Sequence, residues 1–180
     1  YVSEGNLFSY DKNTDESYSY SVVNKLNENE IHNIYYNKDN KYLLIAYKSG
    51  NIDLLYDNGK VINMPDIKDA VLSTEKTIND VCFNDNRIYV ATIFGLVIFD
   101  DQKHHVIESG IYNKDIRSVE VYDGSILICK DSSICISPVD TKHNTENSFS
   151  FLYGWIAEDM KIINNKIIII ANYGTYTTLR

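Results

Sequence analysis

Short apolar runs separated by polar turns recur along the chain, and their spacing predicts strands. Each of four windows holds two apolar positions three residues apart, then a polar turn, then three apolar residues in a row. Apolar runs of this length, bounded by Asn, Asp and Gly, are typical of β-strands joined as hairpins. The strands predicted from these windows are residues 31–36, 43–48, 78–83, 88–93, 116–121, 126–130 and 167–171.

The four windows also share an internal offset. In three windows a glycine lies seven positions after the first residue of the second apolar run (43 to 50, 88 to 95 and 167 to 174). In the remaining window Ser133 lies at that place. The turns inside the windows contain Asn, Asp and Gly, which tolerate the positive φ of tight hairpins. We therefore expect Gly50, Gly95 and Gly174 to occupy equivalent turn positions.

A third strand and a more polar fourth strand are predicted after two of the windows, at 51–56 and 60–63 and at 96–99 and 104–107. Four antiparallel strands repeated about every 40 residues are the pattern of β-propeller blades. The predicted fold is all-β, with about three full blades and two partial ones. The units lie near residues 1–26, 27–70, 75–110, 113–150 and 155–180. Residues 66–75 are the best helical candidate and are interpreted as a loop.

The first and last units contain fewer predicted strands than the others. A propeller ring closes by pairing its first and last strands, and closure protects the strand edges. We therefore expect the chain to be part of a larger propeller, with unmatched edges near residues 1–11 and 167–177. Such open edges predict either pairing with a second copy or aggregation.

Composition and charge exclude several classes of partner. The 180 residues include 15 tyrosines, carry a formal net charge of −8 and contain only two prolines. An acidic chain without a basic face is unsuited to nucleic acid. Direct membrane insertion is not expected, because no apolar run approaches the ~20 residues of a membrane helix.

The residues that most often carry chemistry lack the spacing of a site. The three cysteines, Cys82, Cys129 and Cys135, form no zinc or disulfide motif, and we expect buried free thiols. Neighbouring His104 and His105 would point to opposite faces of a strand, so one metal ion could not easily use both. No nucleophile elbow, phosphate-binding loop or calcium loop is present. The expectation is therefore a protein without catalytic, cofactor-binding or metal-binding residues, and not an enzyme.

One aromatic series is the exception among the local sequence features and is a candidate binding site. Phe149, Phe151, Tyr153 and Trp155 are spaced by two, so in a regular strand all four would project from one face. Such a face can fill the space between two blades, or it can form a platform for a sugar or a partner chain. The same two interpretations apply to Tyr18 and Tyr20.

Several segments resemble a known family of propellers. Residues 33–37, 43–47, 49–56, 76–80 and 89–100 are similar to the N-terminal propeller of PorZ-like proteins, surface components of the type IX secretion system of Bacteroidetes. The phrase Ala-Thr-x-x-Gly-Leu-x-x-Phe-Asp at 91–100 is also similar to the two-component-regulator propeller repeat. That repeat often carries an Asp-Gly-aromatic turn, whereas this chain has Asn-Asp-Asn at 84–86, which favours the PorZ-like family.

The resemblance implies an exported module, in the periplasm or at the cell surface, that holds proteins or glycans in a secretion or attachment complex. The alternative that it leaves open is a ligand-sensing propeller of a hybrid two-component regulator. Neither family implies catalytic residues in the propeller, so no site is carried over. Sequence downstream of Arg180 would separate the two: a transmembrane helix and a kinase domain in one case, a further propeller and a small β-domain in the other.

Overall fold

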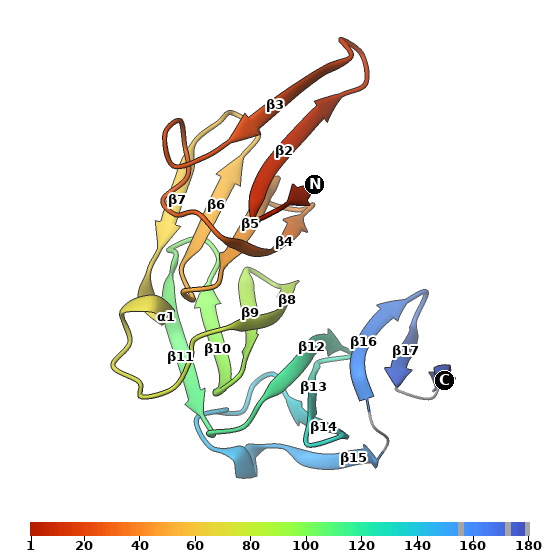
Figure 1. The fold of residues 1–180 in the computed structure, drawn as a ribbon. Helices are drawn as coiled ribbons and strands as arrows, with labels where there is room; N and C mark the ends of the chain where they lie inside the picture. Colours follow the sequence, from red (N-terminus) through yellow and green to blue (C-terminus); the bar gives the residue numbers. More distant parts are fainter. Residues whose placement is uncertain (155–156, 172–173, 179–180) are drawn as a thin grey trace. The chain divides into compact units, whose positions relative to one another are not determined.

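A computed structural model describes residues 1–154, 157–171 and 174–178, and their regular secondary structure is almost entirely β-strand. Helices account for 4% of these described residues, which confirms the all-β prediction. The chain divides into two compact units, Tyr1–Ile78 and Asn79–Arg180. Figure 1 shows the order of the elements, and each unit is described here by itself.

The first unit contains two antiparallel sheets whose strands follow one another in sequence order. The strands of the first sheet are β1 (Val2–Ser3), β2 (Asn6–Asp11) and β3 (Glu16–Tyr20). Those of the second are β4 (Ile31–Asn37), β5 (Tyr42–Tyr47), β6 (Ile52–Tyr56) and β7 (Val61–Met64). A single helical turn, α1 (Asp66–Asp69), follows β7, so the prediction of a loop at 66–75 was wrong there. Ile67 explains the helix, because this turn buries its side chain.

The second unit contains three antiparallel sheets in its described residues, again with their strands in sequence order. The strands of the first sheet are β8 (Ile78–Asn84), β9 (Arg87–Thr92), β10 (Gly95–Asp100) and β11 (His105–Ile111). Those of the second sheet are β12 (Ile116–Tyr122), β13 (Ser125–Lys130), β14 (Ser133–Pro138) and β15 (Ser150–Gly154). A 3-10 turn, η1 (Glu146–Ser148), precedes β15. The third sheet is β16 (Ala157–Ile163), β17 (Lys166–Ala171) and β18 (Gly174–Thr178). Each four-stranded sheet is one propeller blade.

All seven strands predicted from the windows are confirmed, with ends within one residue of β4, β5, β8, β9, β12, β13 and β17. The turns explain this agreement. Asp85 and Asn86 have φ of 46° and 59°, and Asn164 and Asn165 have 51° and 58°. Two consecutive residues with positive φ make the type I′ hairpin turn, for which Asn and Asp are favoured residues. The local sequence therefore determines both the hairpins and their register.

The expected equivalence of the glycines is only partly right. Gly95 and Gly174 each begin a strand and pair with the last residue of the preceding one, Thr92 and Ala171, as Ser133 pairs with Lys130. Gly50 instead lies inside a longer loop, where its N–H donates to the Tyr47 carbonyl (3.0 Å). The β5–β6 loop comprises residues 48–51 and is two residues longer than the β9–β10 and β13–β14 turns, so its glycine lies outside the strand that follows.

Successive sheets within a unit bury their apolar faces against each other. In the first unit, Leu7 of the first sheet and Ile31, Ile45 and Tyr47 of the second share one core. In the second unit, one core joins the sheets of β8–β11 and β12–β15, and another joins those of β12–β15 and β16–β18. Strands that are covered on both faces are apolar at successive positions. This explains the unbroken apolar runs, such as Ile126–Cys129, that marked them in the sequence.

Candidate functional site

The predicted aromatic series does not form a single platform. Phe149 precedes β15 and is 8% exposed, whereas Phe151 is 68% exposed. Phe149 belongs to the core between two sheets, with its ring 6.3 Å from that of Tyr112 and 5.3 Å from that of His143. Its role is therefore packing, and the expectation that it shares a face with the others was wrong.

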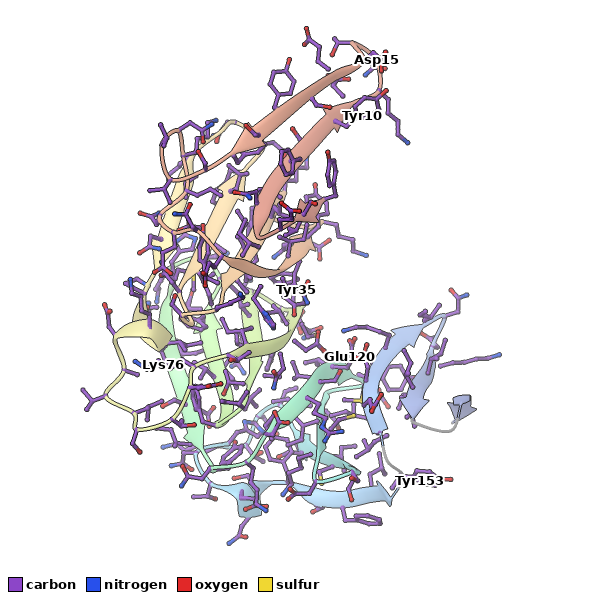
Figure 2. All side chains as sticks on the ribbon, viewed as in Figure 1. Tyr10, Asp15, Tyr35, Lys76, Glu120 and Tyr153 are labelled. Atoms are coloured by element: carbon purple, nitrogen blue, oxygen red, sulfur yellow. The ribbon has the colours of Figure 1, made fainter. Side chains whose placement is uncertain are left out.

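A bulge in β15 explains why the alternation fails. Ile134 of β14 pairs with Tyr153 and Cys135 pairs with Phe151, so Leu152 is an additional residue on the outer strand. One extra residue interrupts the alternation of side chains between the faces of a sheet. Phe151, Leu152 and Tyr153 are all exposed, and they form an apolar stretch on the edge strand of this sheet. Tyr153 is labelled in Figure 2. Trp155 lies outside the described residues.

A groove in the first unit was not anticipated from the sequence. It has a volume of about 690 Å³ and is lined by residues of both sheets of that unit. Apolar side chains from three strands, Leu7, Ile34 and Leu43, line it, and all of them also contact the core of that unit. Tyr20, one of the two tyrosines singled out at 18 and 20, lines the groove. Tyr18 is exposed and hydrogen-bonded to Glu16.

Aromatic and polar side chains give the groove its chemistry. Tyr1 stacks on Phe8 with ring centroids 5.3 Å apart and planes at 16°. The Nζ of Lys25 lies 5.9 Å from the centroid of the Tyr20 ring. Tyr36 also lines the groove and is 57% exposed, and the β6–β7 turn adds Asp57 and Asn58. Exposed rings beside a few hydrogen-bonding groups suit a sugar or an extended peptide.

The first strands of the three sheets in the second unit meet at one buried carboxylate. Asp80 of β8 is 5% exposed and accepts hydrogen bonds from Ser118 Oγ (2.7 Å) and Val119 N (3.1 Å), both on β12. Lys161 of β16 places Nζ 3.0 Å from Asp80 Oδ2 and 3.1 Å from Glu120 Oε1. Glu120 is labelled in Figure 2, on β12. This cluster ties three sheets together by charge.

The protonation of these groups follows from burial and from their partners. Burial would lower the pKa of Lys161, but Asp80 and Glu120 outweigh it and raise this pKa. Burial raises the pKa of Glu120, against the opposing effect of Lys161. Burial, with Glu120 beside it, raises the pKa of the Cys82 thiol to about 12. The lysine is therefore a fixed cation, and the thiol is a poor nucleophile.

A second saturated carboxylate occupies the first unit. Asp53 of β6 is fully buried and accepts from Asn27 N and Nδ2 (both 2.8 Å), Tyr47 OH (2.6 Å) and Asn63 Nδ2 (2.8 Å). Burial first, and then the Asp53 carboxylate, raise the pKa of Tyr47, so its hydroxyl remains a donor. A carboxylate with four partners is a structural anchor and has little capacity left for a ligand.

Neither cluster has the ligand set of a metal centre. Within residues 1–154, 157–171 and 174–178, no three His, Cys, Asp or Glu side chains converge in a way that could hold a metal ion. His104 lies in a turn with φ of 56° and His105 begins β11, so the two histidines are not successive strand residues.

Comparison with known proteins places these features in a family. The model of the PorZ N-terminal β-propeller domain, from the type IX secretion system, matches residues 1–149. The chain belongs to this PorZ propeller family. The match spans the groove, Asp80 and Glu120, and it ends at Phe149, before β15. A search of curated proteins gave no significant match.

Solved structures agree with the PorZ family at the level of fold. PorZ of Porphyromonas gingivalis, an essential surface component of the type IX secretion system, is 24% identical with a TM-score of 0.89, over 98% of this chain and 25% of that one. Extracellular domains of two putative hybrid two-component systems of B. thetaiotaomicron are each 18% identical, with TM-scores of 0.72 and 0.68. They cover 96% of this chain and 24% of theirs. The chain thus spans about a quarter of the length of these proteins.

Proposed function

We propose that the chain is a non-enzymatic, exported binding module that holds a protein or glycan partner in a secretion or attachment complex of the PorZ type. The observation that supports this most strongly is the match of the PorZ propeller family across residues 1–149. The described residues contain no cluster of three His, Cys, Asp or Glu side chains that could hold a metal ion, which is compatible with a binding role. Propellers serve many functions, so the proposal depends on the surfaces as well as on the fold.

Two surfaces are proposed to bind. The first is the groove of the first unit, which Tyr36 and Lys25 line together with apolar side chains. The second is the β15 edge, where Phe151 and Tyr153 are exposed. Aromatic side chains on an exposed surface provide large contact areas at low entropic cost, which is why they recur in binding sites.

The proposed location is outside the cytoplasm, in the periplasm or at the cell surface. The solved structures that share the fold include a bacterial surface component and extracellular domains of putative regulators. In the part of the chain that the structure describes, no helix has the length and apolar character needed to cross a bilayer.

The groove can be tested with matched tyrosine variants. Immobilised oligosaccharides and purified surface proteins of a type IX secretion system are the probes, and surface plasmon resonance gives the affinity. Tyr36→Ala is expected to weaken binding about tenfold, because a central aromatic contact is worth more than 1 kcal/mol. Tyr10 is 51% exposed and lies outside the groove, so Tyr10→Ala is the control and should leave the affinity unchanged. Absence of binding to every probe up to about 1 mM would contradict the proposal.

A second candidate function is a ligand-sensing propeller of a hybrid two-component regulator. It is favoured by the likeness to two extracellular domains of such putative systems, with TM-scores of 0.72 and 0.68. The sequence following Arg180 in the complete gene distinguishes the candidates. A transmembrane helix and a kinase domain would support the sensor, and a further propeller with a small β-domain would support the secretion component.

Self-association is a further partner proposal. The edge expected near residues 1–11 is largely matched, because β2 pairs with both β1 and β3. β3 is instead an edge strand of the first sheet, and its five residues carry exposed or half-exposed side chains. An uncovered strand edge can pair with another chain. Sedimentation velocity at micromolar concentration tests this proposal, since a monomer at all concentrations would contradict it.

A further inference from the structure

Hydrogen bonds at one repeated position join the successive sheets of the second unit. The carboxylate of Asp80 in β8 accepts from the backbone N–H of Val119 in β12 (3.1 Å). One sheet further on, Ser118 Oγ of β12 accepts from the backbone N–H of Met160 in β16 (3.3 Å). Asp80 and Ser118 are each the third residue of a first strand, and Val119 and Met160 are each the fourth residue of the next one. The third residue of one first strand therefore binds the backbone of the following sheet.

Asp159 occupies this third position in β16, the first strand of the β16–β18 sheet. The pairing with the second strand shifts immediately before Asp159, as it does immediately before Ser118. Ser118 is then paired with Cys129 of β13, and Asp159 is paired with Ile170 of β17. Directly opposed residues on neighbouring strands lie on the same face of a sheet. Asp159 and Ser118 therefore lie on equivalent faces of their two sheets.

The two equivalent faces differ in how far they are covered. Leu127 and Cys129, the third and fifth residues of β13, are 2% and 0% exposed because the β16–β18 sheet packs on them. The third and fifth residues of β17 are Ile168, which is half-buried, and Ile170, which is 44% exposed. A structural repeat buries its apolar face only when a neighbour stacks on it. The face that bears Asp159 and these isoleucines has the composition of a sheet interface, and the described residues leave it uncovered.

The interfaces that are covered show which partner fits this face. The residues that cover the face of Leu127 are apolar: Ala157, Met160, Ile167 and Ile169. An ionised aspartate can only accept hydrogen bonds. At Asp80 the covering strand supplies two donors, the Val119 N–H and the hydroxyl of Ser118 (2.7 Å). By analogy, the sheet that fits Asp159 has Ser or Thr as the third residue of its first strand and an apolar residue as the fourth.

We propose that Asp159, Ile168 and Ile170 form an interaction surface for a further propeller blade, and that Asp159 selects a blade with Ser or Thr at the third position of its first strand. The hydroxyl and the next backbone N–H of that blade both donate to the Asp159 carboxylate. A second copy of this chain is disfavoured as the partner. Within the described residues its one hydroxyl at such a position is Ser118, which is already fully buried in its own unit.

A backbone-cyclised peptide that copies the hairpin of residues 114–130 is a suitable probe, because this hairpin supplies both donors to Asp80. It carries Cys129→Ser, a change on the face that points away from the contact. In NMR spectra of the full chain, the methyl signals of Ile168 and Ile170 should shift as the peptide is added to about 1 mM. Asp159→Ala in the chain should weaken binding about tenfold, and so should Ser118→Ala in the peptide.

The two changes together should weaken binding no more than either alone, because both remove the same hydrogen bond. Glu158→Ala is the control, since Glu158 is the exposed neighbour of Asp159, and it should leave the affinity unchanged. Asp159→Asn, which keeps the size of the side chain, should also weaken binding. It is the second variant if Asp159→Ala alters the methyl spectrum of the free chain.

Four results would overturn the proposal. One is the absence of shifts at Ile168 and Ile170 with about 1 mM peptide. Another is binding that survives both changes at Asp159, and a third is a multiplication of the losses when Asp159→Ala meets the Ser118→Ala peptide. The fourth is a shift of the same methyl signals with chain concentration in the absence of peptide, which would identify a second copy as the partner.

Discussion

Gly95 and Gly110 lie so close on the neighbouring strands β10 and β11 that Gly95 has no room for a side chain. A Cβ on Gly95 would lie far inside the contact distance of the Gly110 carbonyl oxygen, and the φ of Gly95 is +152°. Thr92 Oγ1 fixes the same turn, because it accepts from Gly95 N (3.1 Å) and donates to the Gly95 carbonyl (2.8 Å). The pairing of β10 with both β9 and β11 therefore depends on the absence of a side chain at Gly95.

Gly95→Val should destabilise the fold by about 3 kcal/mol or more. Backbone strain at this φ costs about 1–3 kcal/mol, and overpacking adds about 1–3 kcal/mol. Gly124→Ala is the matched control, since Gly124 has φ of +68° but no neighbour within 4 Å of its added Cβ. Urea denaturation measures both variants. A control that loses as much stability as Gly95→Val would show that contact with Gly110 is unimportant.

The strands could be predicted because their signals are local. Two turn residues with positive φ, such as Asp85 and Asn86, lie between apolar runs, and both signals are visible in a short stretch of sequence. The predictions failed where residues were inserted. The two additional residues in the loop around Gly50 and the single additional residue of the bulge at Leu152 each moved a residue from its expected place. Insertions of this kind change the register without changing the apolar pattern.

The charged cluster and the groove could not be predicted, because their members are distant in sequence. Asp80 and Lys161 are separated by 81 positions, and only the stacking of three sheets brings them together. A single acidic or basic residue on a strand is ordinarily exposed, so neither residue by itself indicated a buried ion pair. The groove likewise combines Tyr1 with Tyr36, and Tyr20 was the one lining residue that the sequence pattern had marked as a candidate for binding.

Lys161→Met should destabilise the second unit by about 2–3 kcal/mol. Removal of one partner leaves the buried charge of Asp80 without compensation, which costs about 3–5 kcal/mol in a fully buried pair. The effect should be smaller here because the Lys161 side chain is 43% exposed. Lys103→Met is the control: its Nζ lies 4.0 Å from Asp100 and it is 73% exposed, so little change is expected. Thermal unfolding measures both, and equal midpoints would contradict the role of the cluster.

Glu120→Gln should cost little stability at pH 7 and should flatten the pH dependence of unfolding. Burial raises the pKa of Glu120, so the folded state binds its proton more tightly than the unfolded one. The stabilisation that this group contributes is therefore fully present below about pH 4.3, which is the pKa of a free glutamate. It is lost as the pH rises through the raised pKa of the folded state. Denaturation midpoints from pH 4 to pH 7 provide the test. A variant that keeps the full slope of the unaltered chain would exclude Glu120 as its source.

The three thiols should be nearly inert in the folded protein. All three cysteines are free, with Cys129 and Cys135 buried. Burial, and then nearby acidic groups, raise the pKa of Cys82 and that of Cys129 to about 12. The thiolate is the reactive form, so at pH 8 these two should react on the order of a thousandfold more slowly than a free thiol of pKa about 8.5.

A thiol-disulfide reagent such as dithionitrobenzoate measures this reactivity by absorbance. The folded chain should react slowly, and the chain in urea should release three equivalents rapidly, in line with the three free cysteines. Cys135, whose pKa burial also raises, should be slow as well. Rapid reaction of one equivalent in the folded protein would identify an activated thiol, and Cys82→Ser would then show whether the half-buried Cys82 beside Glu120 is its source.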